Sequence, residues 1–290
     1  MNVERRRVMT PERASELVGR QVPVPARETW IHGESMIVDP DLGDIVIAYL
    51  PLPEATVEAL RWAVRSIGAG LWGSVARAGG LRCRSTTFGM APRRMVYKRD
   101  ACRTTRLANE APDVHAVLAN TSLLLGDMLA EIDPAVAERD RLTIAEIEDE
   151  WRMAPGSQWT SGVVNATSQL PYHRDRMNFD AWAAMPVIRS GVSGGGLHIP
   201  EYDLALTCRD GYAVFFNGHR LVHGVTPITG VRSPRNGKPA GYRYSIVYYA
   251  LRGMKDCATF AAELSGGQER RTAREVHEAE FVTGTKADWR

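Results

Sequence analysis

The sequence predicts an α+β fold in which helices flank a β-sandwich or barrel of the jelly-roll type. Two observations lead to this prediction. In the first half of the chain apolar residues recur at helical spacing, whereas from Trp159 onward they fall in short β-rich segments separated by Gly, Pro, Asn and Asp. The 290 residues are enough to bury a substantial core, and we expect one elaborated domain.

Three helices are expected. Residues 53–67 repeat apolar side chains at helical spacing, and Glu54 near the start complements the helix dipole. A second pattern covers 114–132 and ends at a proline. A third covers 258–281, interrupted or capped at Gly266-Gly267.

Seven short segments in the second half have the composition of strands. They are bounded by turn residues, of which Arg209-Asp210-Gly211 is a good example. Short strands at this spacing favour a jelly roll over a βαβ fold. The segments are 161–165, 187–190, 196–199, 203–208, 212–216, 222–228 and 242–251.

These elements divide the chain into four parts, which we expect to form one integrated domain. Residues 1–50 are a lead-in packed on the core, and residues 51–158 form a helical and arginine-rich flank. Residues 159–252 form the β core that holds the functional site. Residues 253–290 form a C-terminal helical segment.

Composition excludes several classes of protein. Lys and Arg total 36 against 34 Asp and Glu, so the net charge of +2 indicates no particular partner. The four cysteines, Cys83, Cys102, Cys208 and Cys257, have no short spacing, so we predict neither a zinc site nor a disulfide framework and expect reduced thiols. The sequence contains no apolar stretch long enough for a signal peptide or a membrane span, and we expect a soluble, cytoplasmic protein.

Basic residues gather in one stretch of the chain. Between Arg77 and Arg106 nine Lys or Arg face a single acid, Asp100, and the balance reverses over 127–150. This asymmetry indicates a surface that binds a polyanion. A solvated arginine face is the alternative interpretation.

The clearest chemistry lies in His173, Asp175 and His223. Two His and one Asp can occupy one face of an octahedral iron site and leave three adjacent positions for a chelating cosubstrate and O2. His32-Gly33-Glu34 also reads His-x-acid, but no set of strands follows it, whereas the β segments after His173 return the chain to His223. The alternative is a surface Asp with two ordinary histidines.

Arg243 and Ser245 indicate which cosubstrate. Alternate residues of a strand share a face, so the two side chains point at one place. A guanidinium binds a carboxylate with two hydrogen bonds, and the hydroxyl adds a donor. The pair suits the distal carboxylate of 2-oxoglutarate, although an Arg in a strand is by itself usually a salt-bridge partner.

With these residues placed, the segment 172–251 resembles the TET/JBP family of Fe(II)- and 2-oxoglutarate-dependent DNA-base dioxygenases, and its compact microbial or phage members most. Four motifs support the resemblance, and together they cover about a third of the chain. They are His173-Arg174-Asp175-x-x-Asn178, Leu197-His198-Ile199-Pro200-Glu201-Tyr202, Leu221 to Pro227, and Arg243-x-Ser245 followed by Tyr249.

The resemblance implies a double-stranded β-helix over 159–252. It implies an enzyme of bacterial or phage-infected cells that uses Fe(II), 2-oxoglutarate and O2 to hydroxylate the 5-methyl group of 5-methylcytosine in DNA to 5-hydroxymethylcytosine, with further oxidation left open. The iron ligands would be His173, Asp175 and His223; the cosubstrate contacts Arg243, Ser245 and His198; the base contacts Asn178 and Tyr249.

The chain departs from the family at two points. Four scattered cysteines cannot form the zinc-bearing segment that TET enzymes have, and Leu251 stands where those enzymes place a His. The carboxamide of Asn178 both donates and accepts, so it does not separate 5-methylcytosine from thymine. Asn178 alone could also be a turn residue. A JBP-like thymine hydroxylase, a small-molecule 2-oxoglutarate-dependent hydroxylase and a non-catalytic DNA reader remain alternatives.

The arginine-rich stretch gains a role from this resemblance, because a base in duplex DNA is oxidised only after it leaves the stack. Phosphate contacts would hold the duplex meanwhile. The expected contacts are Arg82, Arg84, Arg93, Arg94, Lys98, Arg99 and Arg103, some of which could line the cosubstrate pocket instead. Phe88 and Tyr97 are either wedges in the duplex or core residues.

Overall fold

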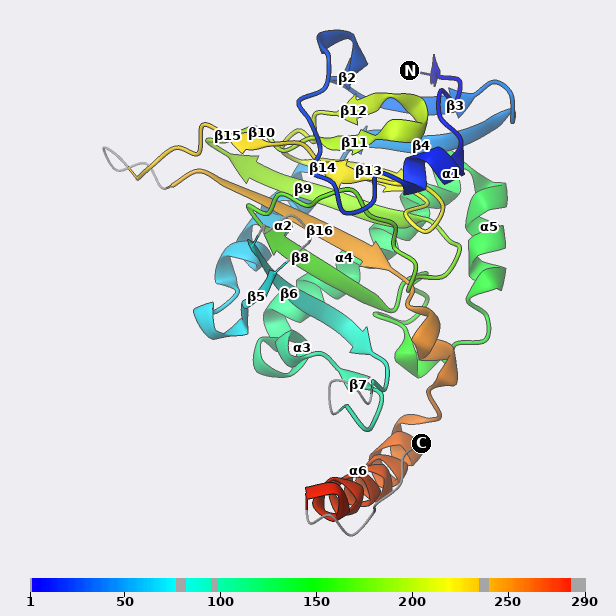
Figure 1. Cartoon of the computed structure of the whole chain (residues 1–290), viewed down its shortest axis with the longest axis vertical. Coiled ribbons are helices and arrows are strands. Elements are labelled where there is room, and N and C mark those ends of the chain that lie inside the picture. The colour runs from blue at the N-terminus through cyan, green and yellow to red at the C-terminus, as the bar shows by residue number, and fades with distance from the viewer. Residues whose placement is uncertain (1, 77–81, 95–98, 235–239, 283–290) are drawn as a thin grey trace.

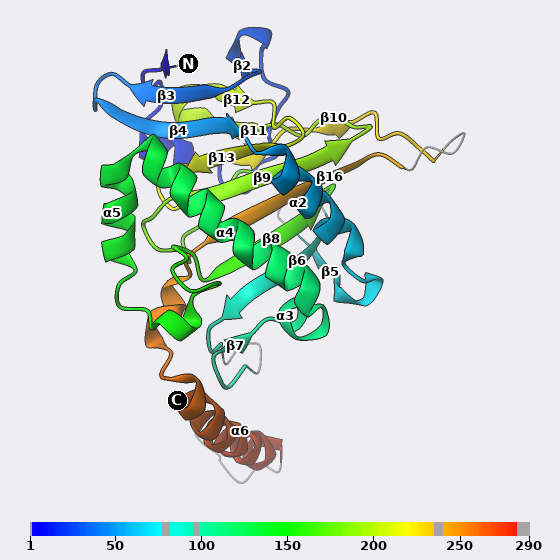
Figure 2. The same ribbon diagram turned by 180° about the vertical axis from the view of Figure 1, so that it is seen from behind.

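A large sheet lies at the centre of the molecule, with a smaller sheet over part of one face and helices over the other (Figures 1 and 2). The computed structural model describes residues 2–76, 82–94, 99–234 and 240–282. Within them the large sheet is 10-stranded, in the order β1-β3-β4-β13-β9-β16-β8-β6-β5, with β7 paired to β6. Its strands are β1 (Asn2–Glu4), β3 (Ser35–Asp39), β4 (Asp44–Pro51), β5 (Gly73–Ala76), β6 (Arg82–Ala91), β7 (Arg103–Thr104), β8 (Ser161–Ala166), β9 (Ala183–Ser190), β13 (Tyr212–Phe216) and β16 (Tyr242–Tyr249).

The smaller sheet has the order β14-β11-β12-β2. One apolar cluster joins it to the large sheet, because Leu197, Ile199 and Leu204 pack with Val187 and Phe216. The short strands are β2 (Trp30–Ile31), β11 (Leu197–Ile199), β12 (Leu204–Leu206) and β14 (Gly224–Val225), and a separate pair is formed by β10 (Ser193–Gly194) and β15 (Ile228–Thr229).

Helices cover the opposite face, where α4 runs diagonally across the strands in Figure 2. A second apolar cluster fills this interface and contains Leu60 of α2, Leu118 of α4 and Ile246 of β16. The helices are α1 (Pro11–Ser15), α2 (Glu54–Ser66), α3 (Arg106–Glu110), α4 (Pro112–Ile132), α5 (Pro134–Thr143) and α6 (Phe260–Val282); the 3-10 turns are η1 (Arg27–Thr29), η2 (Ala69–Leu71), η5 (Asp149–Trp151), η6 (Pro200–Tyr202) and η7 (Arg252–Asp256).

The two faces of β16 have different neighbours, as strand alternation requires. Ile246 and Tyr248 face the helices, and the Tyr248 hydroxyl donates to the backbone carbonyl of Leu118 at 3.0 Å. Ser245 and Val247 face the other way, into a cavity between the sheets. This orientation places the residues expected at the cosubstrate on the interior side of the barrel.

The α+β prediction with a jelly-roll core is confirmed, and the predicted strand 212–216 coincides with β13. The lead-in 1–50 packs on the core by supplying β3 and β4, which are integral strands of the large sheet. The arginine-rich stretch, expected as a flank, contains the ten-residue strand β6. Phe88 and Met90 are the only large apolar residues of this strand, so its sequence gives a weak strand signal.

The C-terminal helix α6 projects from one end of the molecule (Figure 1). It is continuous through Gly266 and Gly267, so the expected interruption there is wrong. A Cβ added at Gly267 would lie 2.7 Å from the Cβ of Ala101. The glycine therefore allows α6 to approach the segment before β7.

The expectation of four reduced cysteines is also wrong. Cys102 and Cys257 form a disulfide across a sequence separation of 155, whereas Cys83 and Cys208 are free and buried. Sequence spacing cannot reveal this pair, because the two cysteines meet only when the chain just before α6 folds against the arginine-rich stretch. No described helix has the length and apolar character needed to cross a membrane.

Candidate functional site

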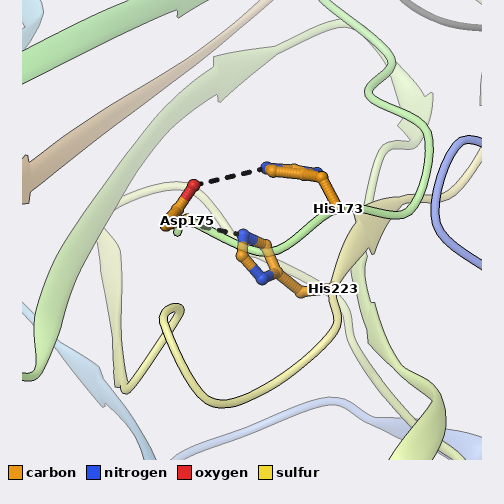
Figure 3. Close-up of side chains that lie close together, drawn as sticks. All are labelled: His173, Asp175 and His223. Carbon is orange, nitrogen blue, oxygen red and sulfur yellow. Dashed lines mark ion pairs between the residues drawn. The ribbon is translucent and has the colours of Figure 1, made fainter. Parts of the chain in front are cut away.

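His173, Asp175 and His223 converge on one point, with their potential ligand atoms all within 4.8 Å of one another (Figure 3). Asp175 faces both imidazoles: its Oδ1 is 3.8 Å from His173 Nε2, and its Oδ2 is 3.7 Å from His223 Nε2. Two imidazole nitrogens and a carboxylate are the donor set of a 2-His-1-carboxylate centre. The residues that the sequence predicts as iron ligands are therefore brought together, and their chemistry fits Fe(II).

The backbone brings the three ligands together by direct pairing of two distant segments. His173 N–H donates to the His223 carbonyl at 2.8 Å, and His223 N–H donates back at 3.0 Å. Asp175 N–H donates to the Gly218 carbonyl at 2.9 Å. A Cβ on Gly218 would lie 2.7 Å from Asp175 Oδ2, so the carboxylate occupies space that only a glycine leaves free.

Backbone carbonyls fix the orientation of both imidazoles. His173 Nδ1–H donates to the Pro171 carbonyl at 2.9 Å, and His223 Nδ1–H donates to the Leu221 carbonyl at 3.0 Å. Each Nε2 therefore keeps its lone pair for a metal. Burial and the neighbouring His173 lower the pKa of His223 to about 4, against the opposing charge of Asp175, so this ring is neutral at physiological pH.

The three ligands line a cavity of about 670 Å³. This volume is within the range of small-molecule sites. Its walls come from both sheets and include the apolar residues Val163, Met185, Leu197, Phe216 and Val247. The cavity thus combines apolar walls with a comparable number of polar side chains.

Arg243 is fully buried, and strand alternation places it on the same face of β16 as Ser245, which lines the cavity. Its Nε, Nη1 and Nη2 all lack a hydrogen-bond partner among the described residues. Burial lowers the pKa of the guanidinium, Cys208 opposes this effect and Arg189 adds to it. Because a buried cation without a counterion is costly, this orphaned fork fits an incoming carboxylate such as that of 2-oxoglutarate.

Two further polar side chains line the cavity, one on β16 and one on the neighbouring strand β8. Ser245 lines the cavity and pairs in register with Asn165 of β8, which pairs in turn with Ser85 of β6. Asn165 is buried, and its Oδ1 also lacks a partner among the described residues. Sequence reasoning missed Asn165, since an Asn within a strand gives no signal of its own.

His198, expected at the cosubstrate, is placed elsewhere. Its neighbour Leu197 lines the cavity, and strand alternation directs His198 to the opposite side of β11. There its Nδ1 lies 2.7 Å from the Tyr172 hydroxyl, and its Nε2 lies 3.7 Å from Asp203. Burial lowers the pKa of His198. The structure therefore does not bring His198 to Arg243 and Ser245.

The residues expected at the base line the same cavity as the metal ligands. Asn178 and Tyr249 both face it, and so does Leu251. The backbones of Asn178 and Leu251 form an isolated antiparallel bridge. The amide of Asn178 and the apolar side chain of Leu251 therefore lie side by side, where the TET pattern has an Asn and a His.

The predicted DNA-binding arginines divide into several groups. Arg93 pairs with the buried Glu263 of α6 at 3.4 Å, and Arg84 lies 4.7 Å over the ring of Trp72, so both have intramolecular partners. Arg94 lines the cavity, and its backbone is bridged to that of Arg99. Arg103 is exposed.

The other predicted positions lie outside the described residues or away from the metal ligands. The side chain of Arg82, together with Lys98 and Tyr97, lies outside the described residues. Phe88 is fully buried and packs edge-on against Tyr248, with ring centroids 5.1 Å apart, so it is a core residue and not a wedge. The second His-x-acid motif, at His32, lies outside the cluster of three ligands.

Comparison with known proteins identifies the fold. No family model matches the chain, and no curated protein is similar in sequence. The structure of NgTET1 in complex with 5mC DNA superposes with a TM-score of 0.59 at 16% identity, covering 90% of this chain and 100% of that one. A Pseudomonas putida prolyl-4-hydroxylase gives a TM-score of 0.44 at 15% identity, covering 73% and 96%, and a 2OG-Fe(II) oxygenase family protein from Burkholderia pseudomallei gives 0.43 at 17%, covering 71% and 88%. Fold and site together define a double-stranded β-helix protein with a 2-His-1-carboxylate centre.

Proposed function

We propose that this protein is an Fe(II)- and 2-oxoglutarate-dependent dioxygenase that hydroxylates the 5-methyl group of 5-methylcytosine in DNA. The observation that supports the proposal most is the joint placement of the triad and of the buried, unpartnered Arg243. A metal triad alone suits many reactions. A triad with an orphaned guanidinium on the same side of the barrel suits a metal-chelating dicarboxylate.

Each residue has a defined task in this reaction. His173, His223 and Asp175 hold the metal, while Arg243 and Ser245 orient the distal carboxylate of the cosubstrate. The apolar part of the cavity wall would limit access of water to the bound substrate. When bound, Fe(II), 2-oxoglutarate and O2 supply the oxidising power that a methyl C–H bond requires. The chain itself contributes position, desolvation and charge.

The base would enter on the side of Asn178 and Tyr249, which share the cavity with the triad. The Asn178 carboxamide would bond the polar edge of the pyrimidine, and the Tyr249 ring would lie beside it. The fold shared with NgTET1, a protein whose structure contains 5mC DNA, supports a nucleic-acid base as the substrate. Arg94, at the edge of the same cavity, would contact a phosphate.

Thymine in DNA is the second candidate substrate, because of Leu251. This residue presents no hydrogen-bonding group beside Asn178, so nothing at that position distinguishes the amino group of cytosine from the carbonyl of thymine. Both bases have a methyl group at the same ring position. The proposed chemistry is therefore common to the two substrates.

One experiment tests reaction and substrate together. The protein is incubated with Fe(II), 2-oxoglutarate and oligonucleotides containing either 5-methylcytosine or thymine opposite its normal partner, and the nucleosides are analysed by mass. We expect 5-hydroxymethylcytosine with a matching amount of succinate, and neither with Asp175→Ala. Hydroxymethyluracil would assign thymine instead. Succinate without either product would contradict a DNA substrate and favour a small-molecule hydroxylase.

A further inference from the structure

Glu201 of η6 is a fully buried carboxylate that the metal chemistry does not use. Its Oε1 accepts two hydrogen bonds from different parts of the chain. Arg174 Nη2 donates at 3.3 Å, and the backbone N–H of Val222 donates at 2.9 Å. Arg174 stands between His173 and Asp175, and Val222 precedes His223. One oxygen atom therefore joins both segments that contain the metal ligands.

The direction of the Arg174 side chain matters for its two neighbours. Arg174 follows the backbone bridge between His173 and His223, and its side chain is directed to Glu201 and Pro11. His173 and Asp175, on either side of it in the chain, face His223 in Figure 3. Holding Arg174 therefore fixes the backbone between these two ligands. The bond to Val222 N–H fixes the backbone one residue before His223 in the same way.

The N-terminal segment also forms hydrogen bonds with Glu201 and Arg174. Val8 and Met9 donate their backbone N–H groups to the Glu201 carbonyl at 2.8 and 3.3 Å. Arg174 Nη2 also donates to the Pro11 carbonyl at 2.9 Å. Only 1% of the Glu201 side chain and 15% of the Arg174 side chain are exposed, so water does not compete for these bonds.

We propose that Glu201 is a positioning residue for the metal centre, which aligns His173, Asp175 and His223 by holding Arg174 and Val222. The ligands themselves do not touch Glu201. Glu201 acts on the geometry of the ligand side chains, so its effect is expected in the affinity for a metal ion before any cosubstrate or DNA is present. This separates the inference from the proposed function, which depends on both.

The test is a titration of the full-length, metal-free protein with Co(II). The visible absorption of the bound ion reports binding and gives the dissociation constant. Glu201→Gln keeps the size and one acceptor but removes the charge that holds Arg174. We expect the dissociation constant for Co(II) to rise about tenfold or more, as when outer-shell partners of metal ligands are removed. Co(II) affinity equal to that of the unmodified protein would overturn the proposal.

Glu263→Gln is the matched control. Glu263 is equally buried, accepts the Cys102 N–H at 2.9 Å and pairs with Arg270 at 3.1 Å, but it belongs to α6 at the far end of the molecule from β11 and β12 (Figure 1). We expect it to lower the thermal midpoint without changing the Co(II) affinity. An equal loss of affinity in both variants would reduce Glu201 to a general stabilising role and overturn the proposal.

If Glu201→Gln does not fold, Arg174→Lys takes its place, because Lys keeps the charge but its shorter side chain does not extend as far as Nη2, the atom that donates to both Glu201 and Pro11. We expect this variant to fold and to bind Co(II) more weakly than the unmodified protein. Unchanged affinity in a folded Arg174→Lys variant would equally overturn the proposal.

Discussion

At the scale of single residues, the approach of Gly218 to the metal ligands shows how little space the centre has. An added Cβ there would meet Asp175 Oδ2 at 2.7 Å and His223 Cε1 at 3.2 Å. Gly218→Ala should therefore displace the carboxylate and weaken Co(II) binding by about tenfold, the scale seen when ligand orientation is disturbed. Titration followed by absorption measures it.

Gly126→Ala is the control for that substitution, since the nearest atom to its new Cβ is 3.8 Å away, in Gln158. We expect it to bind Co(II) like the unmodified protein. Full Co(II) affinity in Gly218→Ala would mean that Asp175 is not held where the structure places it.

Arg243 allows a test of the cosubstrate site that is separate from metal binding. Its guanidinium is buried with all three nitrogens unpartnered within the described chain. Arg243→Lys keeps a positive charge but loses the two-point contact with a carboxylate. We expect KM for 2-oxoglutarate to rise about tenfold to a hundredfold, the range for a charged hydrogen bond, with Co(II) affinity unchanged. An unchanged KM in steady-state kinetics would remove Arg243 from the cosubstrate site.

Leu251 offers a test of base identity, because it lies beside Asn178 at the cavity wall. A His at this position that donates an N–H would suit N3 of cytosine, which accepts, and oppose N3–H of thymine, which donates. Leu251→His should therefore raise the ratio of hydroxymethylcytosine to hydroxymethyluracil by about tenfold in a mixed-substrate assay. Leu251→Met is the control, and a ratio that does not change in Leu251→His would place the base elsewhere in the cavity.

At the scale of elements, the attachment of α6 depends on a small set of contacts beside the arginine-rich stretch. The disulfide joins Cys102 to Cys257, Glu263 accepts the Cys102 N–H at 2.9 Å, and Arg274 pairs with Asp100 at 2.9 Å. α6 therefore secures the short segment from Asp100 to Cys102 before β7.

Breaking that disulfide should destabilise the protein. Its loop spans 155 residues, and reduction should lower the free energy of unfolding by about 2–4 kcal/mol through the greater freedom of the unfolded chain. Thermal unfolding with and without a reductant measures the loss. The double variant Cys102→Ser with Cys257→Ser should unfold at the lower temperature in both conditions; a wild-type midpoint that ignores the reductant would contradict the pairing.

At the scale of the whole molecule, a net charge of only +2 leaves any attraction to DNA to local surfaces. Arg94 is the predicted contact that lines the cavity within the described residues. If it neutralises a phosphate, Arg94→Ala should lower the slope of log affinity against log salt concentration by about 1 for duplex DNA. Fluorescence anisotropy across a salt series gives the slope.

Arg141→Ala provides the comparison, since Arg141 is exposed on α5 and pairs with Glu138 at 2.6 Å, on the helical side of the molecule (Figure 2). Its salt slope should equal that of the unmodified protein. Equal slopes for Arg94→Ala and the unmodified protein would show that the duplex does not approach the cavity past Arg94.

Motifs with strict chemical requirements were predictable from the sequence. The triad and Arg243-x-Ser245 could be assigned because metal ligation and carboxylate binding each require particular side chains, and because strand alternation fixes which side chains share a face. The same alternation applied to β11 would have directed His198 away from the cavity once Leu197 was known to face it. That knowledge required the folded arrangement of the two sheets.

The sequence by itself determined the helices α2, α4 and α6, the β-rich half and the candidate metal ligands, since these follow from local periodicity and side-chain chemistry. Only the tertiary structure decided the place of β3 and β4 in the large sheet, the Cys102–Cys257 pair, the close approach of Gly218 to Asp175 and the link from Glu201 to both ligand segments. Each of these is a contact between residues far apart in the chain. Such contacts depend on where the sheets and helices pack, and local sequence does not encode that packing one residue at a time.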